Sequence, residues 1–409
     1  MSHRRSVFAL ALALAIALAS LAFPSTAAAQ PQVAVVVTTP FGQLDRVEYT
    51  ITDGPGLLDR FKAVRIVRRG APPRPEALLL LPPLGVNHGF YEQTDPHGGV
   101  ASSIAGFFAL RGYDVWQYVS RMEGIPAGTC EAGLIDCSPM AGWDLASMVD
   151  DVAFVRGLVE AENPGAEVAT GGASLGGILA LAVVDDAPAD YDGAIVWEGM
   201  LFTPDPAVRA LNQVFCAQAQ ALLAGGVLFD GAGSSVLKQL ARQAELVPGG
   251  LTPVPLVPPF LTNRQALVSF FRAPPPGPVT TPVPGYFFLA GDPMAGSFEF
   301  ASFERTITNV ERFVAYAPTA LTRDVSCGLA GVDTTHVDDL GAFTGRVLGI
   351  GGGGGFGPFI PDNLALFTSA ADVDFLLEPD FGHIDHFMTP AHQRYVERPI
   401  WRWLRGLDP

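Results

Sequence analysis

Short apolar runs alternate with helix-like segments along most of the chain. The run EALLLLPPLG (76–85) is almost wholly apolar, which is typical of a strand buried on both faces of a sheet. The segment 140–161 instead places apolar residues three and four positions apart, as one buried face of a helix requires. The same patterns predict strands at 33–42, 61–69, 76–85, 113–120, 166–170, 191–200, 345–350 and 372–379. They predict helices at 100–112, 140–161, 175–183 and 361–370, and a last helix from about 391 with Tyr395, Ile400, Trp401 and Leu404 on its core face.

The alternation of strands and helices predicts an α/β fold, in which a parallel sheet is covered by helices on both faces. The rhythm breaks between 201 and 341, where apolar helices such as 214–229 are separated by the proline-rich connectors 251–261 and 272–285. Proline fixes φ and cannot extend a helix, so these connectors are expected to be stiff joints. We therefore expect a core in two parts, 30–200 and 342–409, with a helical, proline-rich cap insertion at 201–341.

The first 29 residues have the pattern of a signal peptide. Arg4 and Arg5 precede an unbroken apolar run, and three alanines end at Ala29, where cleavage is expected. A retained membrane anchor is the alternative, but the apolar run is short for a span and Pro24 follows it. The pattern thus predicts a secreted or periplasmic protein without a stable membrane anchor.

Composition narrows the range of partners. The hydrophobic content of 49% is ample for a core, and the net charge is -16 before the basic signal is removed. An acidic surface repels nucleic acid and anionic lipid, so neither is an expected partner. The oligomeric state stays unknown at this level.

Four cysteines in an exported chain suggest two disulfides, for which three pairings are possible. Cys130 and Cys137 bracket a short loop, CEAGLIDC, so we favour this local pair, which leaves Cys216 with Cys327. Four buried thiols are the alternative.

One serine and one histidine stand where catalytic chemistry would need them. Ser174 lies in VATGGASLGGILALAV (168–183), between a strand-like run and an apolar helix-like run, with Gly172 and Gly176 beside it. Among the seven histidines, His383 follows the last predicted strand in LLEPDFGHIDHFM. A serine hydroxyl is a weak nucleophile unless a base takes its proton and an acid orients that base.

A strand, a G-x-S-x-G turn and a helix, followed much later by Gly-His after the last strand, resemble the α/β-hydrolase fold. The resemblance implies a mostly parallel central sheet flanked by helices, with an inserted helical cap. It also implies that Ser174 is the nucleophile and His383 the base, with His386 as the alternative base.

The resemblance further implies an oxyanion hole made by two backbone N–H groups. One is that of Leu175, which follows the nucleophile, and the other comes from the loop LPPLGVNHGF. Prolines 82 and 83 have no N–H, so Leu84 is the expected donor and Gly85 the next. The family's usual His-Gly pair at this strand end is replaced by the two prolines, and His88 is either a residue of the site or an ordinary loop histidine.

The acid is the member of the triad that the family pattern fixes least. Its usual place follows the penultimate strand, but GIGGGGGFGPFIPDN offers no carboxylate before Asp362, which resembles a helix N-cap. Some members carry the acid at the end of the sixth strand, where AIVWEGM holds Glu198. A charge in an apolar run needs a partner. We favour Glu198 over Asp362 and keep Asp292 and Asp385 as further alternatives.

Two other motifs suggest chemistry that their context disfavours. Gly349, Gly351 and Gly354 have G-x-G-x-x-G spacing, but no helix opens there and the chain is exported, so a dinucleotide site is not expected. HIDH could supply metal ligands but lacks a second spaced cluster, so no metal is expected either. No cofactor is implied.

Together these features predict a secreted serine hydrolase, esterase-like or lipase-like, that cleaves small apolar esters through an acyl-enzyme on Ser174. The apolar composition of the insertion favours an apolar substrate. Amide or peptide hydrolysis and acyl transfer are alternatives with the same fold. A non-catalytic binding protein is the alternative from another class, favoured by the bare glycine run where an acid usually stands.

Overall fold

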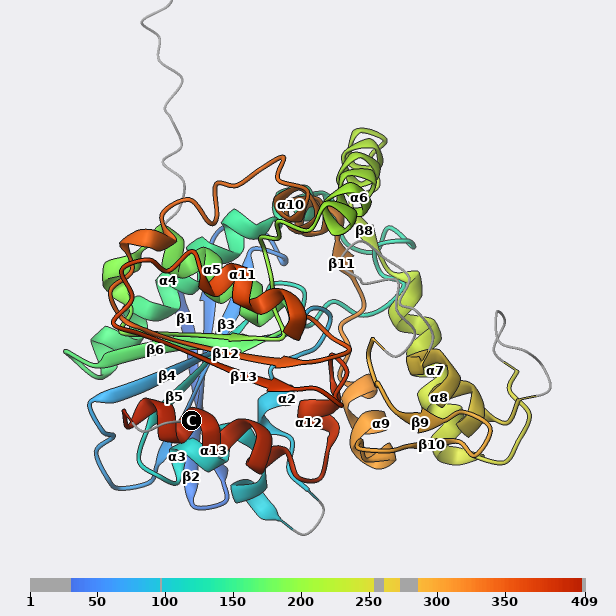
Figure 1. Ribbon diagram of the computed structural model, residues 1–409, viewed down its shortest axis with the longest axis horizontal. Helices are drawn as coiled ribbons and strands as arrows, with labels where there is room; N and C mark the ends of the chain where they lie inside the picture. The colour runs from blue at the N-terminus through green and yellow to red at the C-terminus, as the bar shows by residue number, and fades with distance from the viewer. Residues whose placement is uncertain (1–30, 96–97, 254–260, 273–285, 407–409) are drawn as a thin grey trace, which may run out of the picture.

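The computed structural model describes residues 31–95, 98–253, 261–272 and 286–406 (Figure 1). Within these ranges nine strands form one central sheet, in the order β1-β2-β3-β5-β4-β6-β7-β12-β13. The strands are β1 (Gln32–Phe41), β2 (Leu44–Thr52), β3 (Arg60–Arg68), β4 (Glu76–Leu81), β5 (Asp114–Val119), β6 (Glu167–Ala173), β7 (Gly193–Trp197), β12 (Arg346–Gly352) and β13 (Asp372–Glu378). The predicted signal peptide, 1–29, lies outside the described residues.

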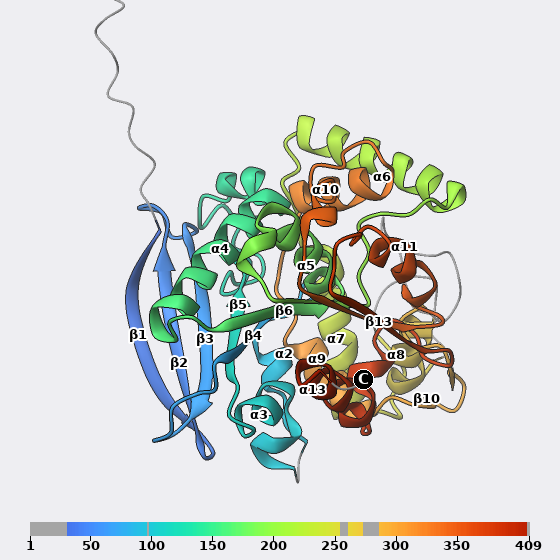
Figure 2. The ribbon, with the colours of Figure 1, turned by 60° about the vertical axis from the view of Figure 1, so that its left-hand side comes forward.

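The sheet is parallel from β5 to β13, and β1, β2 and β3 extend it by antiparallel pairs. The predicted α/β fold with a mostly parallel sheet is therefore confirmed. The sequence patterns did not predict β2, which lies between the first two predicted strands. Polar residues interrupt the apolar pattern of its sequence, LDRVEYTIT. Two of them, Arg46 and Glu48, form an ion pair at 3.0 Å. Figure 2 shows β1 as the outermost strand of the sheet.

Helices cover both faces of the sheet. The helices α4 (Leu145–Glu162), α5 (Leu175–Asp186) and α11 (Ile360–Leu364) lie on one face, while α2 (Gly89–Glu92), α3 (Ile104–Ala109), α12 (Asp385–Met388) and α13 (Arg398–Leu404) lie on the other (Figure 1). Short 3₁₀ turns complete the connections: η1 (Gly99–Ser102), η2 (Ser138–Gly142), η3 (Pro188–Asp190), η4 (Leu340–Ala342) and η5 (Gly357–Phe359).

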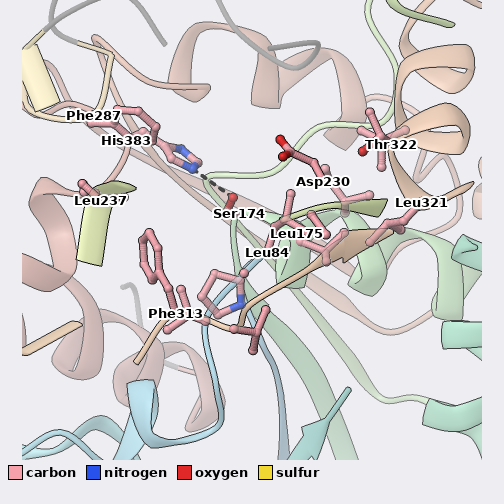
Figure 3. Close-up of a pocket in the computed structure, with 18 of the residues that line it drawn as sticks. Leu84, Ser174, Leu175, Asp230, Leu237, Phe287, Phe313, Leu321, Thr322 and His383 are labelled. Atoms are coloured by element: carbon pink, nitrogen blue, oxygen red, sulfur yellow. Dashed lines mark hydrogen bonds between the residues drawn. The ribbon is translucent and has the colours of Figure 1, made fainter. Parts of the chain in front are cut away.

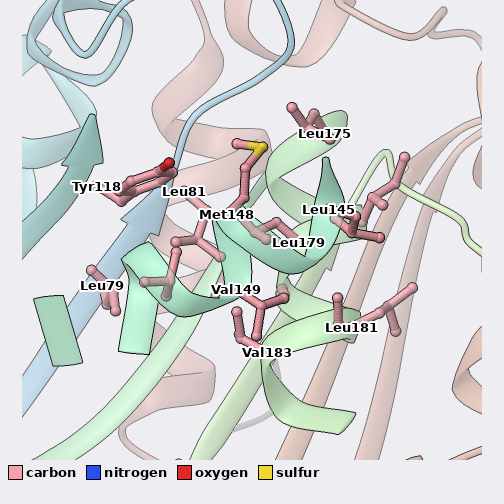
Figure 4. Packing of buried hydrophobic residues seen from close by; sticks show 14 of the residues in the cluster. Leu79, Leu81, Tyr118, Leu145, Met148, Val149, Leu175, Leu179, Leu181 and Val183 are labelled. Carbon is pink, nitrogen blue, oxygen red and sulfur yellow. The ribbon is translucent and has the colours of Figure 1, made fainter. Parts of the chain in front are cut away.

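Alternate residues of the buried strands enter two separate apolar clusters. In β4, Leu79 and Leu81 pack in the cluster under α4 and α5, and Leu78 and Leu80 pack in the cluster with α3. Figure 4 shows the first of these clusters, where α4 and α5 meet the sheet. This two-sided burial explains why β4 reads as an uninterrupted apolar run.

The C-terminal helix differs from its prediction. It begins as a π-turn, η6 (Gln393–Glu397), and continues as α13. The wider π-turn shifts the register of the apolar face. As a result Val396, Ile400 and Trp403 are buried, whereas Tyr395, Trp401 and Leu404 are only partly buried. The predicted core face is therefore correct at Ile400 alone.

The chain between β7 and β12 forms two groups of elements beside the sheet (Figure 1). The first contains α6 (Pro206–Ala224), α10 (Thr319–Leu329) and the small ribbon of β8 (Phe229–Asp230) and β11 (Ala317–Pro318). The second contains α7 (Ala232–Leu246), α8 (Asn263–Arg272), α9 (Phe303–Glu311) and the ribbon of β9 (Gly291–Asp292) and β10 (Ser297–Phe298). Most of the two proline-rich connectors, 254–260 and 273–285, lies outside the described residues. In the described ranges no helix is both long enough and apolar enough to cross a membrane.

The four cysteines form the two predicted pairs. Cys130 is bonded to Cys137 in the loop between β5 and α4, and Cys216 is bonded to Cys327. The second bond joins α6 to α10, and both of its sulfurs belong to buried residues. It closes a loop of 111 residues, against seven for the first bond.

Loss of the Cys216–Cys327 bond is expected to cost more stability than loss of Cys130–Cys137. A cross-link restricts the unfolded chain more when it closes a longer loop, so alanine at both Cys216 and Cys327 should lower the free energy of unfolding by about 5 kcal/mol, against about 2.5 kcal/mol for the other pair. Guanidinium unfolding of the two double variants measures both values. Equal losses would contradict the loop-length argument.

Candidate active site

Ser174 occupies a tight turn between β6 and α5. Its φ of 58° and ψ of -117° lie in a region that a residue with a side chain rarely adopts. A β-carbon at Gly172 would lie 2.0 Å from the carbonyl oxygen of Leu81, and one at Gly176 would lie 2.1 Å from the same atom. Only glycine therefore fits on either side of the serine, because the end of β4 passes so close. The turn is further fixed by the Ser174 N–H, which donates to the Trp197 carbonyl at 2.9 Å.

His383 lies in the loop after β13 and faces the serine. Its Nε2 is 2.9 Å from Ser174 Oγ (Figure 3). Its Nδ1 is 2.8 Å from Glu198 Oε2. Both ring nitrogens are thus used. The Tyr286 ring stacks on the imidazole at 4.7 Å between centroids, and the Phe356 ring meets it edge-on at 5.0 Å. Contacts on its face and at its edge, together with the two hydrogen bonds, hold the ring in one orientation.

Glu198 follows the last residue of β7 and is fully buried. Its φ is 50°, so it too sits in a strained turn. Oε1 accepts the Gly352 N–H, and Oε2 accepts the Phe356 N–H at 2.9 Å besides the His383 contact. These donors satisfy a buried carboxylate that would otherwise be costly.

The glycine run after β12 forms the pocket for this carboxylate. A β-carbon at Gly355 would lie 2.1 Å from Glu198 Oε2, and one at Gly353 would lie 2.3 Å from the Pro379 carbonyl oxygen. The backbone can approach the acid only because side chains are absent there. The glycine run itself contains no carboxylate, but its backbone surrounds the carboxylate of Glu198.

The other carboxylates considered from sequence do not contact the His383 ring. Asp362 lies in the first turn of α11, which begins at Ile360, so the N-cap expectation for it is wrong. Asp292 lies in β9 and accepts the Met294 N–H at 2.9 Å. Asp385 accepts two backbone N–H groups, those of Gly382 and Leu289. Burial raises the pKa of Asp385 to about 7.

His386, the alternative base, forms no hydrogen bond with the serine. It is fully buried, its ring packs edge-on against Phe381 at 5.1 Å, and within the described residues neither ring nitrogen has a hydrogen-bond partner. Burial lowers its pKa to about 3. The residue is therefore neutral near neutral pH.

The neutral burial of His386 predicts an acid-dependent loss of stability. Unfolded histidine binds a proton below a pKa of about 6.5, whereas His386 in the folded chain does not until about 3, so lowering the pH favours unfolding. Between pH 7.5 and pH 5 this residue should cost about 2 kcal/mol of unfolding free energy. The variant His386→Leu should lose about 2 kcal/mol less than the native chain over that interval. Urea unfolding at both pH values measures the difference, and identical pH dependence of the two proteins would contradict it.

The expected oxyanion donors both line a cavity beside the serine. Leu84 and Leu175 belong to its wall (Figure 3), and within the described residues neither amide donates to another protein group. The loop that carries Leu84 is fixed by the insertion, because the Val314 N–H donates to the Gly85 carbonyl at 2.7 Å. His88 is not among the residues that line the cavity, and its Nδ1 contacts Glu123 Oε1 at 2.7 Å.

The cavity has a volume of about 730 Å³, and both Ser174 and His383 line it. Its volume is in the range of small-molecule sites. Both groups of the insertion contribute apolar side chains to it, on opposite sides of the serine in Figure 3. The first group contributes Phe215, Leu222, Leu321 and Val325, and the second contributes Leu237, Phe270, Phe271 and Val310.

Sequence patterns did not indicate several residues of this site. Tyr286 stacks on the histidine but follows a proline-rich segment without periodicity. Phe356 is the one aromatic residue inside the glycine run, and that singularity could have drawn attention to it. Within the described residues no group of three or more His, Cys, Asp or Glu side chains could hold a metal ion.

No protein-family model and no curated protein matches the chain in sequence. Among solved structures the chain is similar to a candidate lipase from Sulfolobus solfataricus, with a TM-score of 0.62 and 14% identity over 91% of this chain and 99% of that one. It also aligns with a soluble variant of monoglyceride lipase from Saccharomyces cerevisiae, with a TM-score of 0.48 and 13% identity over 94% of this chain and 98% of that one.

Proposed function

We propose that this chain, a protein with the α/β-hydrolase fold, is a secreted serine hydrolase that cleaves carboxylic esters of apolar substrates. The observation that carries the proposal is the hydrogen-bonded series Ser174–His383–Glu198, whose serine and histidine line an apolar cavity. His383 is within hydrogen-bond distance of both Ser174 and Glu198, which is the geometry that activates a serine.

In the acylation step, Ser174 Oγ attacks the ester carbonyl carbon while His383 Nε2 takes the hydroxyl proton. Glu198 accepts the Nδ1–H of the same ring, so the Nε2 lone pair faces the serine and the imidazolium that forms is stabilised. The carbonyl oxygen becomes an oxyanion, to which the N–H groups of Leu84 and Leu175 would donate. Collapse breaks the bond to the alcohol oxygen, which leaves with the proton from His383.

In the deacylation step, a water molecule replaces the alcohol. His383 takes one proton of the water, the hydroxide attacks the acyl carbon, and the bond to Ser174 Oγ breaks as the proton returns to the serine. The products are a carboxylic acid and the free enzyme. No cofactor enters either step.

The apolar cavity supports an apolar substrate, and the disulfides support export. Burial of apolar surface contributes about 25 cal/mol per Å², so a largely apolar wall favours the hydrocarbon parts of an ester over a peptide. Disulfides form and persist in oxidising compartments, as the two bonds here would require.

The alternative of a non-catalytic binding protein depended on the missing acid after the penultimate strand. Glu198 now contacts His383 at 2.8 Å, so that feature of the sequence no longer favours it. Amide hydrolysis and acyl transfer use the same residues and are separated by substrate choice.

The proposal is tested by labelling and by a substrate survey. A fluorophosphonate is expected to add to the peptide that contains Ser174, as located by mass spectrometry, and p-nitrophenyl esters are expected to be hydrolysed faster than aminoacyl amides. Absence of label at Ser174 together with absence of ester turnover would refute the proposal.

A further inference from the structure

We propose that Asp385 is a positioning residue, which holds His383 against Ser174 by tying the histidine loop to residues 286–289 of the insertion. The inference rests on the proposed function, because it concerns how the proposed base is kept in place. Asp385 itself does not contact the serine or the histidine ring.

The contacts of Asp385 are made by one carboxylate oxygen. Oδ2 accepts the Gly382 N–H at 2.7 Å and the Leu289 N–H at 3.0 Å. The side chain is fully buried, and within the described residues it forms no ion pair. One oxygen thus joins the residue before His383 to a segment about 95 positions earlier in the chain.

The two segments that Asp385 joins also contact each other directly. The His383 N–H donates to the Tyr286 carbonyl at 2.5 Å, and the Ile384 N–H donates to the Phe287 carbonyl at 3.0 Å. A β-carbon at Gly382 would lie 2.7 Å from the Tyr286 and Phe287 carbonyl oxygens, so the close approach requires glycine there. The glycine that precedes His383 is therefore required by the close packing of the two segments.

This arrangement sets the position of the imidazole. The Tyr286 ring lies on its face with an interplanar angle of 18°, and Tyr286 belongs to the segment that Asp385 secures. Without the carboxylate, the buried Gly382 N–H and the partly buried Leu289 N–H would lose their acceptor, and the two segments would be held together less firmly. A shift of about 1 Å between a base and its nucleophile can lower a rate about 100-fold.

Stability alone does not account for a carboxylate at this position. Burial raises the pKa of Asp385 to about 7, even though the Gly382 and Leu289 N–H groups and the charge of Arg272 favour its ionised form. A buried acid without an ion pair is retained at a cost, which fits a role in placing other groups.

Three substitutions of Asp385 distinguish the effect of its acceptor oxygen from the effect of its negative charge. Asp385→Asn keeps an oxygen that accepts both N–H groups, and its amide nitrogen replaces the Oδ1 atom, which has no partner within the described residues. Asp385→Ala removes the acceptor, and Asp385→Glu keeps the charge but displaces it by one methylene. Asp185→Ala is the matched control, because Asp185 is also buried and accepts a backbone N–H, that of Asp339 at 2.7 Å, at the end of α5 farthest from Ser174.

Each variant is assayed for kcat and KM with a p-nitrophenyl ester and for the rate of fluorophosphonate labelling, both corrected for the folded fraction. We expect Asp385→Ala and Asp385→Glu to lower kcat and the labelling rate about 100-fold with little change in KM. Asp385→Asn and Asp185→Ala should stay close to the native chain. If Asp385→Ala does not fold, the kcat values of Asp385→Glu and Asp385→Asn test the proposal on their own.

The proposal for Asp385 is overturned if Asp385→Ala or Asp385→Glu keeps native kcat, or if Asp385→Asn is as inactive as they are. A native chain without label or turnover would instead refute the proposed function, before any variant is compared.

Discussion

Replacing Ser174 with alanine is expected to lower kcat for ester hydrolysis by about four to six orders of magnitude. The variant loses the atom that attacks the carbonyl carbon, and the turn at φ 58° offers no other hydroxyl at that point. Substrate binding should change little, because the apolar cavity wall is untouched. Steady-state kinetics with a p-nitrophenyl ester measure kcat and KM, and fluorophosphonate labelling should disappear.

Two further variants complete this experiment. Alanine at His383 should reduce kcat to a similar level, and the double variant should lose no more than either single one, because nucleophile and base act as a unit. Ser138→Ala, at an exposed serine of η2, is the control and should retain native kcat. Retention of more than about one hundredth of native kcat in Ser174→Ala would mean that another residue attacks the ester.

Glu198→Gln is expected to lower kcat about 10⁴-fold while leaving the fold intact. Glutamine has one acceptor oxygen where glutamate has two, so the N–H groups of Gly352 and Phe356 compete with His383 for it. An amide N–H facing Nδ1 would favour the imidazole tautomer that carries its proton on Nε2, and this tautomer cannot accept a proton from Ser174.

Asp362→Asn is the matched comparison for Glu198→Gln. Asp362 stands where the family pattern places the acid most often, yet it lies in the first turn of α11 and makes no contact with His383. Its substitution should leave kcat within about twofold of the native value, because Asp362 is not hydrogen-bonded to the proposed base. The reverse result, an inactive Asp362 variant and an active Glu198 variant, would identify Asp362 in α11 as the acid of the triad.

The fold was predictable because its signals are local. A strand buried on both faces must be continuously apolar, so β4, β5 and β7 could be located without any long-range information. β2 was not predicted because its charged side chains interrupt the apolar pattern. They are accommodated in the strand by ion pairs such as that of Arg46 with Glu48. The π-turn before α13 escaped because a change of helical register leaves no mark in composition.

The candidate site was predictable only where its residues stand at the ends of elements. Ser174 and His383 follow β6 and β13, and Glu198 could be recognised as a charged residue inside an apolar run. What surrounds them depends on which backbones meet in space. The N–H groups that hold Glu198 and the Tyr286 ring that covers His383 come from residues 150 or 100 positions away, at no spacing that a pattern could reveal.

The close fit between Gly355 and Glu198 constrains how the protein can diverge. A β-carbon at 355 would lie 2.1 Å from Glu198 Oε2, so a side chain there would displace the carboxylate from its position beside His383. A lineage that moved its acid to the turn after β12 would need to exchange both positions together. We therefore expect the two sites to covary among homologues, with glutamate at 198 found where glycine occupies 355.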